Sequence, residues 1–168
     1  YIDVLLRDRL ENPKDDMLTL VANAEIDGEP VDWNLKLGYI RLLIVAGIDT
    51  TWSAIGASLW HLAAHPADQQ RLRDEPGLLP SAIEELLRAY APVTMARKVI
   101  GETEIGGCPV HPGDQMLVTF PAANHDPAAF ENPDVFDMDR LNNRHVAFGL
   151  GIHRCVGSNL ARLEMVVA

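Results

Sequence analysis

The sequence predicts a mainly α-helical protein with a small β element, and three observations support this fold class. An apolar-periodic stretch over about 34–64 has the length of a major helix. A shorter helical pattern follows over about 81–91. Between about 95 and 119, short strand-like runs are separated by Gly-Gly and Pro-Gly-Asp, which is typical of hairpins.

The remaining elements follow from local signals along the chain. Residues 2–11 predict a helix, and the turn at 12–16 precedes a second one. A charged surface helix is expected over 67–74. Ser81 and Glu84 fit a capping box at the start of the next helix. A last helix is expected to begin at about Cys155.

Composition limits the classes of function. The 168 residues carry a formal net charge of −10, and 48% of them are hydrophobic. The hydrophobic fraction is ordinary for a globular domain. The negative net charge argues against nucleic-acid binding. The most apolar run, 42–48, is too short to cross a membrane, and residues 1–10 do not resemble a signal peptide. We therefore expect a cytoplasmic protein without a membrane partner.

The two ends of the sequence predict a partial domain. The first residue is Tyr1, and the last seven residues, 162–168, continue an apolar helical pattern without a C-cap. The sequence therefore predicts one partial domain over 1–168.

The segment FGLGIHRCVG at 148–157 contains the strongest chemical signal. Its glycines permit tight turns and the close approach of a flat group to the backbone. A cysteine at the start of a helix is more readily a thiolate, and a thiolate is both a nucleophile and a metal ligand. Both roles remain open for Cys155. Cys108, 47 residues away, is expected to be a small hydrophobic residue, because no zinc or CxxC spacing is present.

A second signal is the polar pair Asp49 and Thr50 within an apolar helical stretch. One interpretation is a helix break, with Gly47 ending one helix and Asp49 capping the next. The other is a continuous helix opened locally, in which Thr50 bonds the carbonyl of Ala46 and Gly47 leaves room for a small ligand. Trp52, where a capping box needs Glu or Gln, favours the continuous helix.

A third signal is Glu85 with Arg88, three residues apart on one helix. Taken alone, this spacing predicts an exposed ion pair worth a few tenths of a kcal/mol. His61 and His65, near a predicted helix end, are expected to be surface or capping residues rather than metal ligands.

Together these segments resemble the cytochrome P450 family. The glycine loop matches F-x-x-G-x-R/H-x-C-x-G at every fixed position, and residues 46–51 match A-G-x-D-T-T. Glu85 to Arg88 matches E-x-x-R, and residues 136–140 resemble the F-x-x-x-R segment that ends at Arg140. The resemblance covers essentially all 168 residues and implies the C-terminal part of the P450 fold, truncated at both ends.

The resemblance implies a role for each matched residue. Cys155 would supply the thiolate ligand of a haem b iron. Arg97 and His153 would hold the haem propionates, and Phe148 would pack beside the sulfur. The full set of implied cofactor contacts is Arg97, Phe148, Gly149, His153 and Gly157.

The other matched residues divide into three groups by resemblance. Asp49 and Thr50 would assist oxygen binding and proton delivery, with O2 as co-substrate. Glu85, Arg88 and Arg140 would form a structural network, because arginine can hold a carboxylate bidentately. The substrate pocket would be lined by Ala46, Gly47, Val93, Thr94 and Met95.

The predicted function is therefore a haem-thiolate monooxygenase that inserts one oxygen atom of O2 into a small organic substrate. Its electrons would come from NAD(P)H through a ferredoxin, or through a fused flavin and iron–sulfur reductase. Arg144, Arg154 and Arg162 are expected to form a docking patch for that partner. Two alternatives are a non-catalytic haem carrier or sensor and a haem-free thiol enzyme that uses Cys155 as nucleophile.

Overall fold

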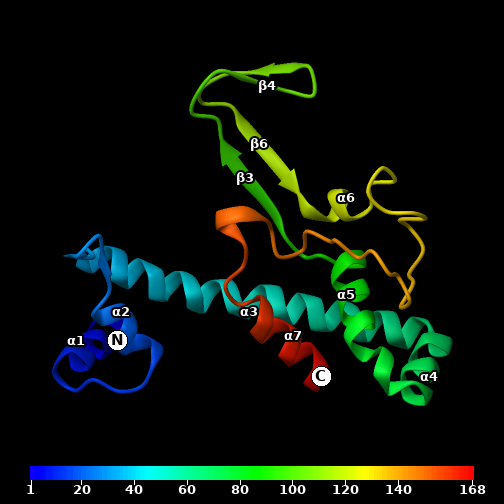
Figure 1. Cartoon of the computed structure of the whole chain (residues 1–168), viewed down its shortest axis with the longest axis horizontal. Coiled ribbons are helices and arrows are strands. Elements are labelled where there is room, and N and C mark those ends of the chain that lie inside the picture. Colours follow the sequence, from blue (N-terminus) through cyan, green and yellow to red (C-terminus); the bar gives the residue numbers. More distant parts are fainter. The chain divides into compact units, whose positions relative to one another are not determined.

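The computed structural model describes all residues from 1 to 168, and they form two compact units. The first unit is Tyr1–Asp49 and the second is Thr50–Ala168. One helix, α3 (Trp33–Ala64), runs through the boundary between them (Figure 1).

The first unit contains two short helices, a small hairpin and the first half of α3. The elements are α1 (Ile2–Glu11), α2 (Met17–Ala22), β1 (Glu25–Ile26) and β2 (Glu29–Pro30). Asp16 is the N-cap of α2 and accepts a 2.8 Å bond from the backbone N–H of Thr19. A hydrogen bond from Arg9, together with this cap, lowers the pKa of Asp16 to about 2. The buried core of the unit is Leu6, Val21, Ala22, Leu37 and Ile40.

Helix α3 continues without interruption through the Asp49-Thr50 pair. The helix-break interpretation is therefore wrong, and the helix expected over about 34–64 is observed over Trp33–Ala64. The apolar residues keep the same helical period on both sides of the polar pair. A continuous helix also keeps the backbone hydrogen bonds across this pair, so it is preferred over a break.

Much of α3 is both apolar and exposed, including Val45, Ile48 and Trp52. By length and composition alone this helix could cross a membrane: an 18-residue window has a mean hydropathy of 1.5 and is 11% buried. The expectation from the 42–48 run was too narrow, because it counted only uninterrupted apolar residues. The core helix of a soluble protein meets the same criteria of length and composition.

The second unit contains the rest of α3 and a chain of short elements. These elements are α4 (Pro66–Asp74), η1 (Pro76–Leu78), α5 (Leu79–Ala89), β3 (Thr94–Lys98), β4 (Thr103–Ile105), β5 (Cys108–Val110), β6 (Gln115–Thr119), α6 (Phe120–Asn124), η2 (Gly151–His153) and α7 (Ser158–Val167). The predicted fold class, mainly α with a small β element, is confirmed.

The β element is a long antiparallel pair with a hairpin at its tip (Figure 1). Strands β3 and β6 pair antiparallel, with Thr94 opposite Thr119 and Lys98 opposite Gln115. Strands β4 and β5 pair through the Gly106-Gly107 turn, where both glycines have positive φ. The first strand begins at Thr94, three residues earlier than the pattern at Arg97 predicted.

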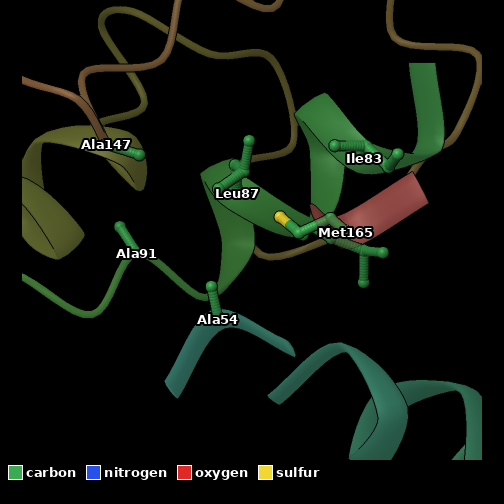
Figure 2. Packing of buried hydrophobic residues seen from close by; sticks show 7 residues of the cluster. Ala54, Ile83, Leu87, Ala91, Ala147 and Met165 are labelled. Atoms are coloured by element: carbon green, nitrogen blue, oxygen red, sulfur yellow. The ribbon is translucent and has the colours of Figure 1, made fainter. Parts of the chain in front are cut away.

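The core of the second unit lies between α5, α7 and the second half of α3. Figure 2 shows side chains from these elements and from the chain before the glycine loop meeting in one cluster. The buried members of the cluster are Ala54, Ile83, Leu86, Leu87, Ala91, Ala147 and Met165. Phe148 packs against this cluster, so the start of the glycine loop is anchored to the core.

Two predicted helix starts are wrong. Helix α5 begins at Leu79 rather than Ser81, with Pro80 in its first turn. The Ser81 hydroxyl donates to the carbonyl of Leu78 at 2.9 Å, so Ser81 and Glu84 do not form a capping box. Helix α7 begins at Ser158 with Gly157 as its N-cap, so Cys155 precedes the helix.

The surface position expected for His61 is also wrong. Its side chain is 1% exposed, and its ring lies 3.9 Å from that of Phe136, centroid to centroid. Burial lowers the pKa of His61 and outweighs the opposing hydrogen bond to Asp68. His65 is exposed, as the sequence suggested.

Candidate functional site

The glycine loop is closed by hydrogen bonds of its own backbone. The backbone N–H of Cys155 donates to the carbonyl of Phe148 at 2.8 Å, and that of Gly149 donates to Val146 at 2.8 Å. Gly149 has a φ of +68° and Gly151 a φ of +64°, which side chains with a Cβ rarely adopt. The glycines are therefore needed for the loop to bring Cys155 back to Phe148.

The Cys155 thiol is free and exposed at the end of this loop. A Cβ added at Gly157 would lie 3.9 Å from the Cys155 Sγ, so the glycine keeps the space beside the sulfur clear. An exposed sulfur with a glycine two residues away fits a flat macrocycle that offers a metal to the thiolate.

The N-terminus of α7 supports the sulfur less directly than predicted. Cys155 lies two residues before the N-cap Gly157, and the N–H of Ser158 donates to the Cys155 carbonyl at 3.4 Å. The positive end of the helix is still close, but the sulfur is not in the first turn. Arg162, one turn into α7, supplies a full positive charge that interacts with Cys155.

Behind the loop, Arg162 joins Phe148 to helix α5. The Arg162 guanidinium lies 4.6 Å from the centroid of the Phe148 ring and donates to Glu84 through Nη2 at 2.8 Å. Nε2 of His145 lies 2.9 Å from the same Glu84 oxygen. Burial opposes ionisation of Glu84, but the bonds from Arg162 and His145 prevail and lower its pKa to about 2.

This contact corrects the expected docking patch. Arg162 is bound to Glu84 and Phe148, whereas Arg144 and Arg154 are exposed and have no ion pair. The sequence reasoning missed Glu84 and His145 as partners of the loop. The only signal for Glu84 in the sequence was its acidic charge beside Glu85. We assigned Glu84 to the expected capping box with Ser81.

The structure brings Glu85, Arg88 and Arg140 together in a buried network. Arg88 holds both oxygens of Glu85, with Nε to Oε2 and Nη2 to Oε1 each at 2.8 Å. Arg140 Nε donates to Oε2 at 3.0 Å. Glu85 is 0% exposed and Arg88 1% exposed, so the exposed ion pair expected from spacing alone is wrong.

Two further donors complete the coordination of Glu85. Nδ2 of Asn143 donates to Oε2 at 3.0 Å, and the backbone N–H of Asp137 donates to Oε1 at 2.9 Å. Burial opposes ionisation of Glu85, but the bonds led by Arg88 outweigh it, and its pKa lies below the ordinary value. The carboxylate therefore stays charged among five donors.

The remaining N–H groups of Arg88 and Arg140 donate to backbone carbonyls. Arg88 donates to the carbonyls of Asn124 at 2.9 Å and Pro133 at 2.7 Å. Arg140 donates to those of Glu131 at 2.8 Å and Val135 at 2.9 Å. These bonds tie the irregular segment between α6 and the glycine loop to α5. They also satisfy carbonyl groups that have no partner in regular secondary structure.

The two expected propionate partners, Arg97 and His153, are both exposed, and neither bonds Cys155. Arg97 is exposed on β3, where its Nη1 donates to the carbonyl of Ala96 at 2.9 Å. His153 is exposed at the end of η2. Each side chain is accessible to a ligand carboxylate.

The expected oxygen and substrate residues occupy two elements. On α3, Ala46, Gly47 and Asp49 are exposed and belong to the first unit, and Thr50 is half-buried and belongs to the second. A Cβ at Gly47 would meet no atom within 4 Å. Val93 is half-buried before β3, and Thr94 and Met95 are exposed on it.

Comparison with known proteins gives one consistent result. The family model for cytochrome P450 matches residues 77–168. The chain is 37% identical to cytochrome P450-terp of a Pseudomonas species over 168 residues, covering 99% of this chain and 39% of that protein. It is 38% identical to linalool 8-monooxygenase of Pseudomonas putida, with 99% and 41% covered.

A solved structure agrees over the whole chain. The polyketide-synthase cytochrome P450 PksS of Bacillus subtilis matches with a TM-score of 0.93 at 38% identity, covering 100% of this chain and 44% of that one. The chain thus spans about two fifths of the length of the curated relatives it matches.

These matches define the class as a haem-thiolate protein. The chain belongs to the cytochrome P450 family, and it corresponds to part of the P450 fold. The resemblance found in the sequence is confirmed. The family implies haem b with thiolate ligation as cofactor and O2 as co-substrate, and the exposed Cys155 within its glycine loop fits that cofactor.

Proposed function

We propose that this chain is part of a monooxygenase that inserts one oxygen atom of O2 into a small organic substrate. The observation that carries the proposal is the exposed Cys155 thiol on a glycine loop closed against Phe148. When bound, the haem iron supplies the redox chemistry that activates O2. The residues of this chain bind the cofactor, hold the loop and deliver protons.

Cofactor binding is assigned to the loop and to two cationic positions. Cys155 Sγ would ligate the iron as thiolate, while Gly149 and Gly157 let the macrocycle approach the backbone. Arg97 and His153 would hold the propionates, since both side chains are exposed and make no ion pair.

Proton delivery is assigned to adjacent residues of α3. The Asp49 carboxylate is exposed and can exchange protons with solvent, and the Thr50 hydroxyl can both donate and accept. A proton would pass from Asp49 through bound water to the Thr50 Oγ1 and then toward the reacting oxygen. General acid catalysis of this kind contributes typically about 10²–10⁴-fold.

The Glu85, Arg88 and Arg140 network is assigned a structural role. Its bonds link α5 to the irregular chain that precedes the loop. A buried carboxylate with five donors cannot approach a substrate, because no part of it is exposed. The network would fix the position from which the loop carries Cys155.

The proposed substrate pocket and electron-transfer partner also rest on membership of the cytochrome P450 family. The pocket would include Ala46, Gly47, Val93, Thr94 and Met95. Electrons would come from NAD(P)H through a ferredoxin or a fused flavin and iron–sulfur reductase, with exposed Arg144 and Arg154 as contacts for an acidic partner. The net charge of −10 argues against nucleic acid as a partner, and a cytoplasmic location fits.

The haem-free thiol enzyme is a weaker account. A nucleophilic cysteine needs a base within hydrogen-bond reach. His153 and Cys155 are two residues apart, yet no hydrogen bond joins their side chains. No other histidine bonds the thiol.

The test is the absorption spectrum of the reduced, CO-treated full-length protein. A strongly red-shifted Soret band is expected for the parent and for Cys108→Ser, because Cys108 is the other free and exposed cysteine. The band should be lost in Cys155→Ser. Absence of any haem band in the parent, or survival of the shifted band in Cys155→Ser, would overturn the proposal.

A further inference from the structure

The corner between α3 and α4 gathers two histidines and an aspartate that the proposed oxygen chemistry does not use. His61 lies in the last turn of α3, His65 is the N-cap of α4, and Asp68 lies in its first turn. One ligand atom from each residue lies within 4.8 Å of the other two. We propose that His61, His65 and Asp68 form a binding site for Zn²⁺, separate from the haem site.

The hydrogen bond of His65 fixes which nitrogen is available to a metal. Its Nδ1 lies 2.9 Å from the backbone carbonyl oxygen of His61. A carbonyl only accepts, so in the neutral ring Nδ1 carries the proton and Nε2 keeps its lone pair. Zinc-binding histidines are typically oriented in this way, with the second nitrogen donating to a backbone carbonyl or a carboxylate.

His61 is held in a way that permits either tautomer. Its Nδ1 lies 2.7 Å from the Tyr90 hydroxyl and its Nε2 lies 3.0 Å from Oδ2 of Asp68. Without metal, Nε2 carries the proton and donates to Asp68, while the Tyr90 hydroxyl donates to Nδ1. A tyrosine hydroxyl also accepts, so the proton can move to Nδ1 and leave Nε2 to the metal.

Zn²⁺ would then take the place of the proton between His61 and Asp68. No net proton needs to leave the neutral ring, because Tyr90 accepts from Nδ1 after the tautomer change. The rings of His61 and His65 are stacked, with centroids 4.2 Å apart and planes 20° from parallel. Both rings must tilt on binding so that their Nε2 lone pairs converge on one ion.

The donor set selects the class of metal. Two imidazoles and one carboxylate suit Zn²⁺, whereas Mg²⁺ and Ca²⁺ prefer oxygen ligands throughout. His61 is buried, while His65 and part of Asp68 face solvent, so an ion can enter from the outside. Three protein ligands leave the fourth tetrahedral position to water.

Binding would fasten the end of α3 to the first turn of α4. Through Tyr90, the C-cap residue of α5, it would also connect to the helix that carries Glu85. The expected consequence is a rise in the melting temperature of the protein when Zn²⁺ is added.

The experiment is equilibrium dialysis of chelator-stripped, haem-loaded full-length protein against Zn²⁺, with bound zinc measured by elemental analysis. A Cys108→Ser background removes the exposed thiol that could bind zinc elsewhere. In that background we expect one Zn²⁺ per chain, retained in His111→Ala and not displaced by millimolar Mg²⁺. His111 is an exposed histidine outside the site, so it is a matched control for His65.

His65→Ala and Asp68→Asn should each weaken binding at least about tenfold. His65 is exposed, and Asp68→Asn keeps the size of the half-buried side chain, so the fold should survive both changes. Tyr90→Phe tests positioning: it keeps all three ligands but should cost about 10–100-fold in affinity, as loss of an outer hydrogen bond does. The proposal is overturned if the parent binds no zinc at about 100 μM, if His65→Ala binds like the parent, or if Mg²⁺ displaces the zinc.

Discussion

Replacing Glu85 by glutamine should destabilise the protein far more than an ordinary loss of one ion pair. Glutamine keeps the size of the side chain and one acceptor oxygen, but it removes the negative charge. The guanidinium of Arg88, 1% exposed, would then lie buried opposite a neutral amide, and Arg140 would lose the same partner. The new NH2 group would also face at least two of the five donors, because Oε1 accepts from two of them and Oε2 from three.

The magnitude follows from burial. Breaking a buried ion pair by removing one partner costs about 3–5 kcal/mol, because the other charge is left uncompensated. Domains are stable by only about 5–15 kcal/mol, so this loss is a large part of the total. For a urea slope of about 2 kcal/mol/M, a loss of about 4 kcal/mol lowers the midpoint by about 2 M.

The assay is urea unfolding of the full-length protein at pH 7, followed by circular dichroism. Glu75→Gln is the matched control, because it makes the same chemical change in an exposed pair with Arg71, at 3.3 Å. That control should change stability by less than about 1 kcal/mol. If Glu85→Gln lies within about 1 kcal/mol of Glu75→Gln, the structural role of the network is refuted.

Three further predictions concern separate parts of the site. Thr50→Ala should release more peroxide and form less product per NAD(P)H, and an unchanged yield would remove Thr50 from proton delivery. The stability that Glu84 contributes should be complete above its ordinary pKa of 4.5 and disappear as pH falls toward its folded value of about 2; the gap in urea midpoint between parent and Glu84→Gln should therefore close over that range, and a constant gap would contradict the pairing with Arg162. Charge reversal at Arg144 should slow electron transfer and flatten its salt dependence, whereas no change in either would exclude a docking role.

The sequence could predict the elements that depend on local pattern. The period of apolar residues located α3 to within one residue at its start, and Trp52 correctly argued for a continuous helix. The Gly-Gly turn located the hairpin of β4 and β5. In the glycine loop, residue type was sufficient because positive φ is a local demand that glycine meets.

Properties that depend on distant partners could not be predicted. Glu85 is buried because Asp137, Arg140 and Asn143, more than 50 residues away, converge on it. Spacing on one helix contains no information about such partners, so an exposed pair was the natural expectation. The same reason explains His61, whose burial depends on Phe136, 75 positions further along the chain.

The predicted starts of α5 and α7 were wrong for a different reason. At each start, two competing signals lie within three residues of each other. At α5, Pro80 in the first turn outweighed Ser81 as a cap. At α7, Gly157 serves as N-cap, and the backbone of Cys155 is used to close the loop on Phe148 instead.

The central claim is that Cys155 supplies the sulfur ligand of a haem iron. The most direct measurement is X-ray absorption at the iron edge of the full-length protein, which counts sulfur atoms bound to the metal. The account predicts one sulfur ligand in the parent and in Cys108→Ser, and none in Cys155→Ser. Iron bound only by nitrogen and oxygen in the parent, or a sulfur ligand that persists in Cys155→Ser, would contradict it.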